Sequence, residues 1–142
     1  MASRVLALHF TPRAGELVES VSELCLQENF GAVRDHHSRP SSSRQVLLMD
    51  FETLKGFGIT PGALKENITT QGLVFDSLAA GGRWRVGEEV LLEITKPCNP
   101  CHLLDDLRPG LEEALGGRRG WLARVVRGGI IRVGDQIRPI ES

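Results

Sequence analysis

Apolar residues along this chain alternate with polar ones or form short runs, and this pattern predicts strands rather than long helices. The predicted strands cover residues 4–10, 18–26, 45–51, 90–95, 121–126 and 129–133, with one or two more within 67–75. The stretch 18–26 alternates only roughly, so a helical turn is a second interpretation of it. Most of the chain is therefore expected to lie in short strands.

Two short segments have the signature of helices. Residues 52–55 follow a predicted buried strand and are stopped by Gly56. Residues 109–115 begin with Pro109, which suits the first position of a helix, and are followed by Gly116 at a typical helix end. We expect one or two small helices.

Turn residues separate these elements. The polar segment 31–44 contains Pro40 and three consecutive serines, which predicts a loop. The dipeptide 128–129 is Gly-Gly, which adopts positive φ without steric cost and predicts a two-residue hairpin loop between the flanking strands.

One short motif occurs twice, at residues 84–90 and 131–137, with the pattern apolar-Arg-Val-Gly-acid-x-aliphatic. The Gly permits a sharp turn, and the acid can fasten that turn through backbone hydrogen bonds. Two such corners suggest a strongly bent sheet. Without a regular alternation of strands and helices, the chain is predicted to be one mainly β domain over residues 1–142, with a β-barrel-like sheet.

Composition narrows the classes of function. A length of 142 residues suits one domain, and a net charge of −1 gives no sign of nucleic-acid or membrane-surface binding. The apolar runs are too short to span a bilayer, and the start has no long apolar signal region. Three cysteines are too few for a disulfide framework, which suits a reducing compartment. We expect a cytoplasmic protein that binds neither nucleic acid nor membrane.

The segment Cys98-Asn-Pro-Cys101-His102 carries the most reactive side chains of the chain. Its pattern matches c-type haem attachment, part of a zinc site, or a thioredoxin-like redox pair. Each lacks supporting context, namely export, a second ligand pair, or an α/β fold. Two buried thiols near a turn are the plainest interpretation, because free cysteine is among the most buried residue types.

Local charge around Cys101 acts in both directions. The following short helix, His102 and Lys96 favour the thiolate, which is the nucleophilic and metal-binding form. Asp105 and Asp106 oppose it. The residues themselves leave the balance open.

A second constellation is Asp35 with His36 and His37. Neighbouring side chains of a strand point to opposite sides, so both histidines could bind one metal only from a loop. We expect a hydrogen-bonded Asp–His pair that orders the loop. The alternative is that the pair lines the same pocket as Cys101.

Four segments, in order, resemble the MOSC family, the C-terminal domain type of molybdenum cofactor sulfurase. They are GAVRDHH at 31–37 with RQV at 44–46, PGALKENIT at 61–69, NPCHLLDDLRPGL at 99–111, and VVRGGIIRVGD at 125–135. Any one match is weak, but four in the right order are specific. The resemblance implies a β-barrel-like MOSC fold.

The resemblance also implies a role for Cys101, the position of the family's shared cysteine. As a sulfur carrier, it would take sulfur from a pyridoxal-phosphate-dependent cysteine desulfurase and pass it to a metal–sulfur or molybdopterin centre. As a metal ligand, it would bind molybdenum in a molybdopterin enzyme that reduces N-hydroxylated compounds with an electron-transfer partner. This chain is not expected to bind pyridoxal phosphate itself.

Within that resemblance, several residues are candidates for the cofactor. Arg44 and Arg119 could bind its phosphate, since a guanidinium forms paired, charge-assisted bonds. Glu66 and Asn67 could read the pterin edge, and Thr69 could add a hydroxyl. The alternative roles are a solvated surface for the arginines and a turn cap for Asn67.

The remaining cofactor candidates are Asp35 and His37, through the loop described above. One position departs from the family pattern: Lys65 stands where Gly is usual before Glu-Asn. Either the backbone turn differs there, or the site gains a cation.

Overall fold

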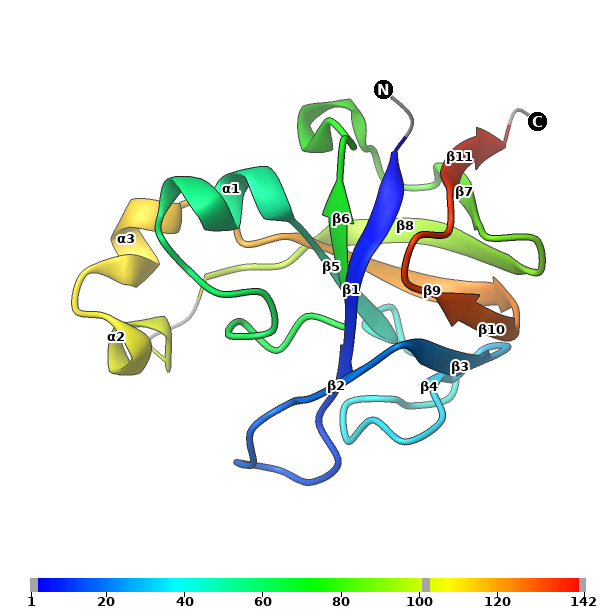
Figure 1. Cartoon of the computed structure of the whole chain (residues 1–142), viewed down its shortest axis with the longest axis horizontal. Helices are drawn as coiled ribbons and strands as arrows, with labels where there is room; N and C mark the ends of the chain where they lie inside the picture. The colour runs from blue at the N-terminus through cyan, green and yellow to red at the C-terminus, as the bar shows by residue number, and fades with distance from the viewer. Residues whose placement is uncertain (1–2, 101–102, 141–142) are drawn as a thin grey trace.

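The computed structural model describes residues 3–100 and 103–140, and strands predominate in it (Figure 1). The strands are β1 (Arg4–Phe10), β2 (Glu19–Val21), β3 (Glu23–Gln27), β4 (Gly31–Ala32), β5 (Val46–Asp50), β6 (Ile68–Gln71), β7 (Arg83–Val86), β8 (Val90–Pro97), β9 (Trp121–Arg127), β10 (Gly129–Arg132) and β11 (Ile137–Ile140). The helices are α1 (Phe51–Gly56), α2 (Leu103–Leu107) and α3 (Leu111–Leu115), with a 3₁₀ turn, η1, at Phe75–Ser77. The prediction of a mainly β fold is confirmed.

The strands form two sheets. The larger has eight strands in the order β11-β7-β8-β9-β5-β6-β1-β2, and the smaller has the order β10-β3-β4. The pairing of β5 with β6 is parallel, whereas every other described pairing is antiparallel. The three helices lie together on one side of the sheets in Figure 1.

The larger sheet is strongly curled but is not closed into a barrel. Strand β1 reaches the segment that precedes β11, where the amide of Val5 donates to the carbonyl of Asp135 (2.8 Å). The amide of Gly134 returns a bond to the carbonyl of Val5 (2.8 Å). Barrel-like therefore describes the curvature, while the named strands keep open edges.

The two repeated corners are confirmed as turns, and they contact each other. Gly87 and Gly134 both have positive φ, 65° and 96°. Asp135 fastens its corner, because its Oδ2 accepts a bond from the amide of Arg132 (2.8 Å). The amide of Gly87 donates to the carbonyl of Gln136 (2.9 Å), so the copies of the motif support one another.

The hairpin predicted at residues 128–129 is wrong. Strand β10 pairs with β3, with Ile130 opposite Cys25, while β9 pairs with β5 and β8. The chain changes sheet at Gly128, where a Cβ would lie 2.5 Å from the carbonyl oxygen of Leu26. Glycine is needed there for close backbone approach, not for a hairpin turn.

The strand interpretation of residues 18–26 is confirmed, and the helical one is wrong. The chain breaks at Ser22, so that β2 joins the larger sheet and β3 the smaller. In β3 exposed and buried residues alternate strictly, as in a strand with one face on the core.

Both predicted helices are present, with small differences. Helix α3 begins at Leu111 after Gly110, which has φ 84°, so Pro109 is not its first residue. Helix α2 and the two-residue β4, which lies inside the predicted loop 31–44, were not predicted. Elements this short lack a periodic pattern and form because tertiary packing holds them.

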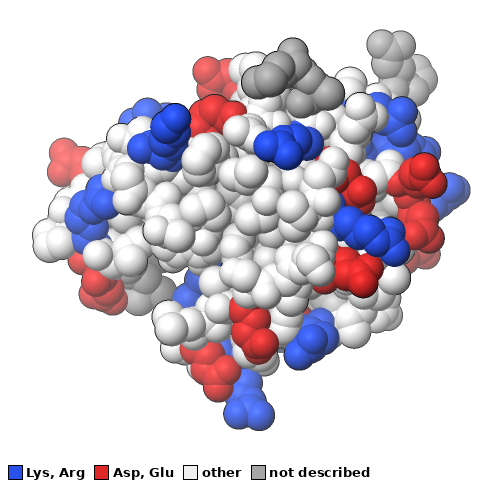
Figure 2. Space-filling view, viewed as in Figure 1, with Lys and Arg blue, Asp and Glu red and all other residues white. Residues whose placement is uncertain are grey.

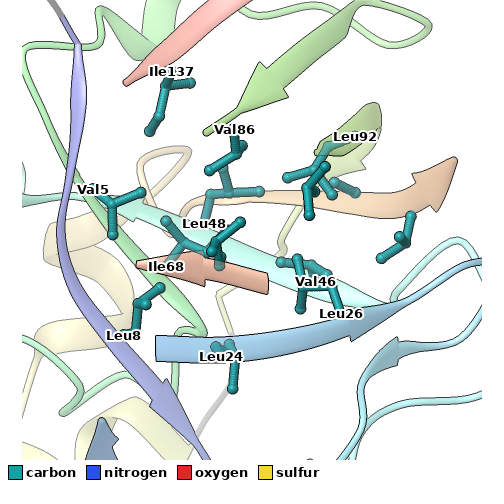
Figure 3. Close-up of a cluster of buried hydrophobic side chains, with 14 of the residues drawn as sticks. Val5, Leu8, Leu24, Leu26, Val46, Leu48, Ile68, Val86, Leu92 and Ile137 are labelled. Atoms are coloured by element: carbon teal, nitrogen blue, oxygen red, sulfur yellow. The ribbon is translucent and has the colours of Figure 1, made fainter. Parts of the chain in front are cut away.

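Two hydrophobic clusters stabilise the fold. The main one fills the space between the sheets with 19 buried residues, among them Leu8, Leu26, Leu92 and Ile137 (Figure 3). A smaller cluster joins the helices to the larger sheet through Met49 of β5. Its other members are Leu54, Ile59, Leu64, Leu104, Leu111 and Leu115.

The surface carries charges of both signs. In the view of Figure 2, Lys, Arg, Asp and Glu are interspersed around a largely uncharged centre, so no single sign dominates that face. Among the residues described, no helix has the length and apolar character to cross a membrane.

The sheet change at Gly128 leads to a first prediction. Gly128→Ala should lower the free energy of unfolding by about 2–3 kcal/mol, because the added methyl group meets backbone atoms that cannot move aside. Gly117→Ala is the matched control, since a Cβ at Gly117 meets no atom within 4 Å. Urea unfolding of both variants measures the difference, and equal stability would contradict the close contact.

Candidate functional site

A pocket of about 460 Å³ opens beside α2, at the edge of the smaller hydrophobic cluster. Its walls come from the loops after β1, after β4 and before β6, from the first residues of β5 and β9, and from α2. Leu47, Leu64, Leu104, Leu107 and Leu122 supply the apolar part of the wall. These elements are distant in sequence, so the pocket exists only in the folded chain.

The charged residues that line this pocket are all positive. They are Arg44, Lys65 and Arg119, with His36 and His37 beside them, and none of its described lining residues is Asp or Glu. Elsewhere the surface mixes both signs, as Figure 2 shows for one face. A local excess of positive charge in a concave site attracts anions.

Arg119 is the most strongly constrained of the three cations. The residue is only 9% exposed, and its Nη2 donates to the carbonyl of Leu64 (2.8 Å). Its Nε and Nη1 are buried and have no hydrogen-bond partner among the described atoms. Leaving charged donors unsatisfied is costly, so these two donors are the strongest candidates in the lining for binding an acceptor.

The backbone beside Arg119 is packed tightly. Gly120 has φ 114°, and a Cβ on it would lie 2.5 Å from the carbonyl oxygen of Leu48 in β5. Its own carbonyl accepts a bond from the amide of Cys98 (2.8 Å) at the end of β8. The base of the pocket is therefore fixed to two neighbouring strands.

Asn67 lines the pocket while its amide joins two strands. Its Oδ1 accepts a bond from the amide of Leu47 in β5 (3.0 Å), and its Nδ2 donates to the carbonyl of His9 in β1 (3.3 Å). The turn-cap role considered for this side chain is wrong, because both bonds go to the backbone of separate strands and neither goes to local backbone. An amide keeps a second N–H and a second lone pair in such an arrangement.

Asp35 and His37 form the pair expected from the sequence. The buried carboxylate of Asp35 accepts bonds from the amides of Thr11 (2.6 Å) and His37 (3.0 Å), and lies 3.3 Å from Nδ1 of His37. Burial alone would raise the pKa of Asp35, but these hydrogen bonds and the charge of His37 hold the pKa below its usual range. Asp35 orders the loop, and His37 lines the pocket.

Glu66 and Thr69 do not line the pocket but lie behind it. Both are fully buried, and Oε2 of Glu66 accepts bonds from the amide of Gly62 and the hydroxyl of Thr69, each at 2.8 Å. Gly62 has φ 91° and packs against the ring of His9. Burial lowers the pKa of His9, although the charge of nearby Glu66 opposes that shift.

Cys101 and His102 lie outside the described residues, so the haem, zinc and redox-pair interpretations stay predictions. On either side of them, Cys98 and Leu104 both line the pocket, and Cys98 is buried. Within the described parts of the chain, no three His, Cys, Asp or Glu side chains gather as a metal site.

The structure thus brings together four of the seven residues proposed for the cofactor, His37, Arg44, Asn67 and Arg119. Lys65, for which the sequence left open a changed turn or an added cation, lies in the lining. The sequence analysis did not include Cys98 or the leucine wall among the site residues. Nothing in the pattern of the leucines separates a pocket wall from a core.

A family model for the MOSC domain matches residues 34–138. A protein of Gibberella moniliformis named "Reductase" is 33% identical over 84 residues, which make up 56% of this chain. The chain spans only 15% of the length of that relative.

Solved structures show the same fold. The YuaD protein from Bacillus subtilis has a TM-score of 0.79 at 19% identity, covering 96% of this chain and 94% of its own. YiiM from Escherichia coli has a TM-score of 0.72 at 21% identity, covering 98% of this chain and 70% of its own.

The loop anchored by Asp35 gives a pH-dependent prediction. Asp35→Asn should destabilise the protein by about 1–3 kcal/mol at pH 7, because one buried amide loses its acceptor. The pKa of Asp35 is lowered by folding, so its contribution is present above the unfolded pKa, about 3.9, and is lost as pH falls through the folded value. Urea unfolding between pH 7 and pH 3 should show the difference shrinking below about pH 4.

Asp50→Asn is the control, because folding shifts the pKa of Asp50 upward and that of Asp35 downward. Burial raises the pKa of Asp50, so the wild-type protein gains stability as pH falls through that raised value. Asn also caps a helix and can accept the bond that Thr53 donates to this carboxylate (2.7 Å). The Asp50→Asn variant should match or exceed the wild type in stability at pH 7. A constant effect of Asp35→Asn at all pH values would contradict its assigned role.

Proposed function

Since this chain belongs to the MOSC domain family, we propose that it binds the phosphate-bearing pterin of a molybdenum cofactor in the cationic pocket and carries sulfur on Cys101. It would serve as a sulfur carrier or cofactor-accessory protein, with a pyridoxal-phosphate-dependent cysteine desulfurase as its donor. The proposal depends on two kinds of residue, those that bind the anion and the thiol that accepts sulfur.

One observation carries the binding part of the proposal: the two buried, unpartnered donors of Arg119 in a pocket whose described lining contains no carboxylate. A phosphate satisfies such donors well, because a guanidinium matches its oxygens with paired, charge-assisted bonds. Arg44 is exposed at the same pocket and adds a second cation. The chemistry of these donors fits the phosphate of the cofactor.

The remaining polar groups suit the pterin ring. The spare N–H and lone pair of Asn67 provide a donor and an acceptor, which a ring edge requires. The leucine wall excludes water from one side of the pocket. When bound, the cofactor supplies a metal–sulfur centre. The residues of this chain bind it and bring a thiol near it.

The sulfur part of the proposal is supported by the chain on both sides of Cys101, since Cys98 and Leu104 both line the pocket. The Cys101 thiolate would attack the outer sulfur of the donor's persulfide. A new S–S bond forms on Cys101, the S–S bond of the donor breaks, and the donor leaves as a thiolate. The exchange needs no added oxidant or reductant.

A second function is favoured by the name of the Gibberella relative, "Reductase". In that case Cys101 would be a thiolate ligand to molybdenum, since soft sulfur ligands suit such metals. Reduction of N-hydroxylated compounds would then require electrons from a separate electron-transfer protein. Both functions share the anion-binding pocket and differ in what Cys101 does.

Arg119→Gln tests the pocket. Expressed in a host that makes molybdenum cofactor, the wild-type protein should retain pterin and molybdenum, measured by fluorescence after oxidation and by metal analysis. The variant should retain about tenfold less, because a charge-assisted bond contributes about 1.5–3 kcal/mol. Arg118→Gln is the control, since Arg118 bonds to Ala114 and stacks on Phe57 instead of lining this pocket. Equal retention by both variants, or none by the wild type, would reject the proposal.

Cys101→Ser tests the sulfur step. After incubation with a cysteine desulfurase and cysteine, intact-mass analysis of the wild type should show one added sulfur atom, which Cys101→Ser should lack. Cys98→Ser, a buried thiol of the same pocket, should keep the gain. If the wild type gains no sulfur, and the Cys101→Ser variant retains less molybdenum than the wild type, the metal-ligand function replaces the carrier function.

A further inference from the structure

Lys65 adopts a backbone conformation that its side chain disfavours. Its φ is 63°, in the left-handed region where a Cβ crowds the following carbonyl, and its amide closes a turn by bonding to the carbonyl of Gly62 (2.9 Å). A glycine would adopt this geometry without strain. Strain of this kind persists where the surrounding structure imposes it, often at functional sites.

The other described non-glycine residues with positive φ, Asn29 and Ser41, differ from Lys65. They stabilise each other, because the amide of Ser41 donates to Oδ1 of Asn29 (3.2 Å) and Nδ2 of Asn29 donates to the hydroxyl of Ser41 (3.3 Å). Asn also tolerates this conformation well. For Lys65, the structure gives the side chain no compensating bond to any described residue. Lys65 as a residue is half-buried and belongs to the lining of the cationic pocket.

We propose that Lys65 is a specificity-determining residue that adapts this pocket to a ligand carrying two linked phosphates rather than one. The inference rests on the proposed function, because it takes the same pocket as the cofactor site. It adds the charge class of the ligand, and it assigns that preference to one residue whose side chain makes no bond to any described residue.

The charge balance of the pocket supports this preference. A phosphate monoester carries a charge of about −1.5 to −2 at pH 7, which two cations already neutralise. Arg44, Lys65 and Arg119 make three, and no described carboxylate of the lining offsets them. A pyrophosphate group carries more negative charge, so it uses the third cation while a single phosphate does not. Coulomb attraction in a partly buried site is screened less than at the surface.

Three substitutions separate the charge of Lys65 from its backbone. Lys65→Gln removes the charge and keeps the strained geometry, Lys65→Arg keeps both, and Lys65→Gly removes both. Lys55→Gln is the matched control, because Lys55 lies on α1 outside this pocket. Calorimetric titration with inorganic phosphate and with pyrophosphate, at two salt concentrations, measures the affinity of each variant.

The wild type should bind pyrophosphate more tightly than phosphate. Lys65→Gln should weaken pyrophosphate binding about tenfold and phosphate binding less than about threefold, while Lys65→Arg and Lys55→Gln keep the wild-type ratio. Lys65→Gly should lose the same affinity yet raise the midpoint of thermal unfolding by about 3 °C, because it relieves the strain. This opposite movement of affinity and stability is not expected of a merely structural residue.

The outcomes distinguish this inference from the proposed function. If the wild type and Lys65→Gln have the same ratio of pyrophosphate to phosphate affinity, the role of Lys65 is overturned while the anion site stands. If the wild type binds neither anion, the inference and the phosphate part of the proposed function fail together. If it binds pyrophosphate through Lys65 but retains no pterin in a competent host, only the proposed cofactor is wrong.

Discussion

Arg119 lines the pocket, and two of its guanidinium donors have no hydrogen-bond partner among the described atoms. The interpretation of the site depends on these two donors. Burying an ion without a partner costs on the order of several kcal/mol. The carbonyl of Leu64 offsets part of that cost by accepting one guanidinium bond, and the tight packing of Gly120 against the carbonyl of Leu48 fixes the adjacent backbone. In the proposed function, an anion bound here would gain these bonds without first ordering the side chain, because the guanidinium is already held in place.

The motif residues form two layers that act differently. His37, Arg44, Asn67 and Arg119 face the pocket, whereas Asp35, Glu66 and Thr69 are buried behind it. The rear layer fixes the front through backbone amides, since Asp35 binds the amide of His37 and Glu66 binds that of Gly62. In the proposed function, substitution in the first layer would alter ligand contacts, and substitution in the second would alter the position of the loops.

The sequence predicted the strands with clear periodicity, the two Gly-acid corners and the arginines of the site. The prediction of a hairpin at Gly128 was wrong. A Gly-Gly pair between two strands indicates a hairpin, but the same pair also suits a chain that crosses to another sheet, as β10 does when it pairs with β3. The sequence also failed to separate the two layers, since Glu66 and Asn67 are adjacent and equally polar while only Asn67 lines the pocket. Burial of that kind follows from the pairing of β5 with β6 and of β1 with β6, which connect distant segments and leave no local pattern.

The positions of Cys98 and Arg119 connect the two chemistries assigned to this pocket. Strand β8 ends where the amide of Cys98 bonds to the carbonyl of Gly120, the residue next to Arg119. On the far side of the motif, Asp105 of α2 accepts a bond from the amide of Glu112 in α3, which ties that helix to the smaller hydrophobic cluster. The described residues on either side of the motif are thus each bonded to a neighbouring element, and on the β8 side the bond lies next to Arg119. In the proposed function, a cofactor bound at Arg119 would therefore lie beside the end of β8, next to Cys98.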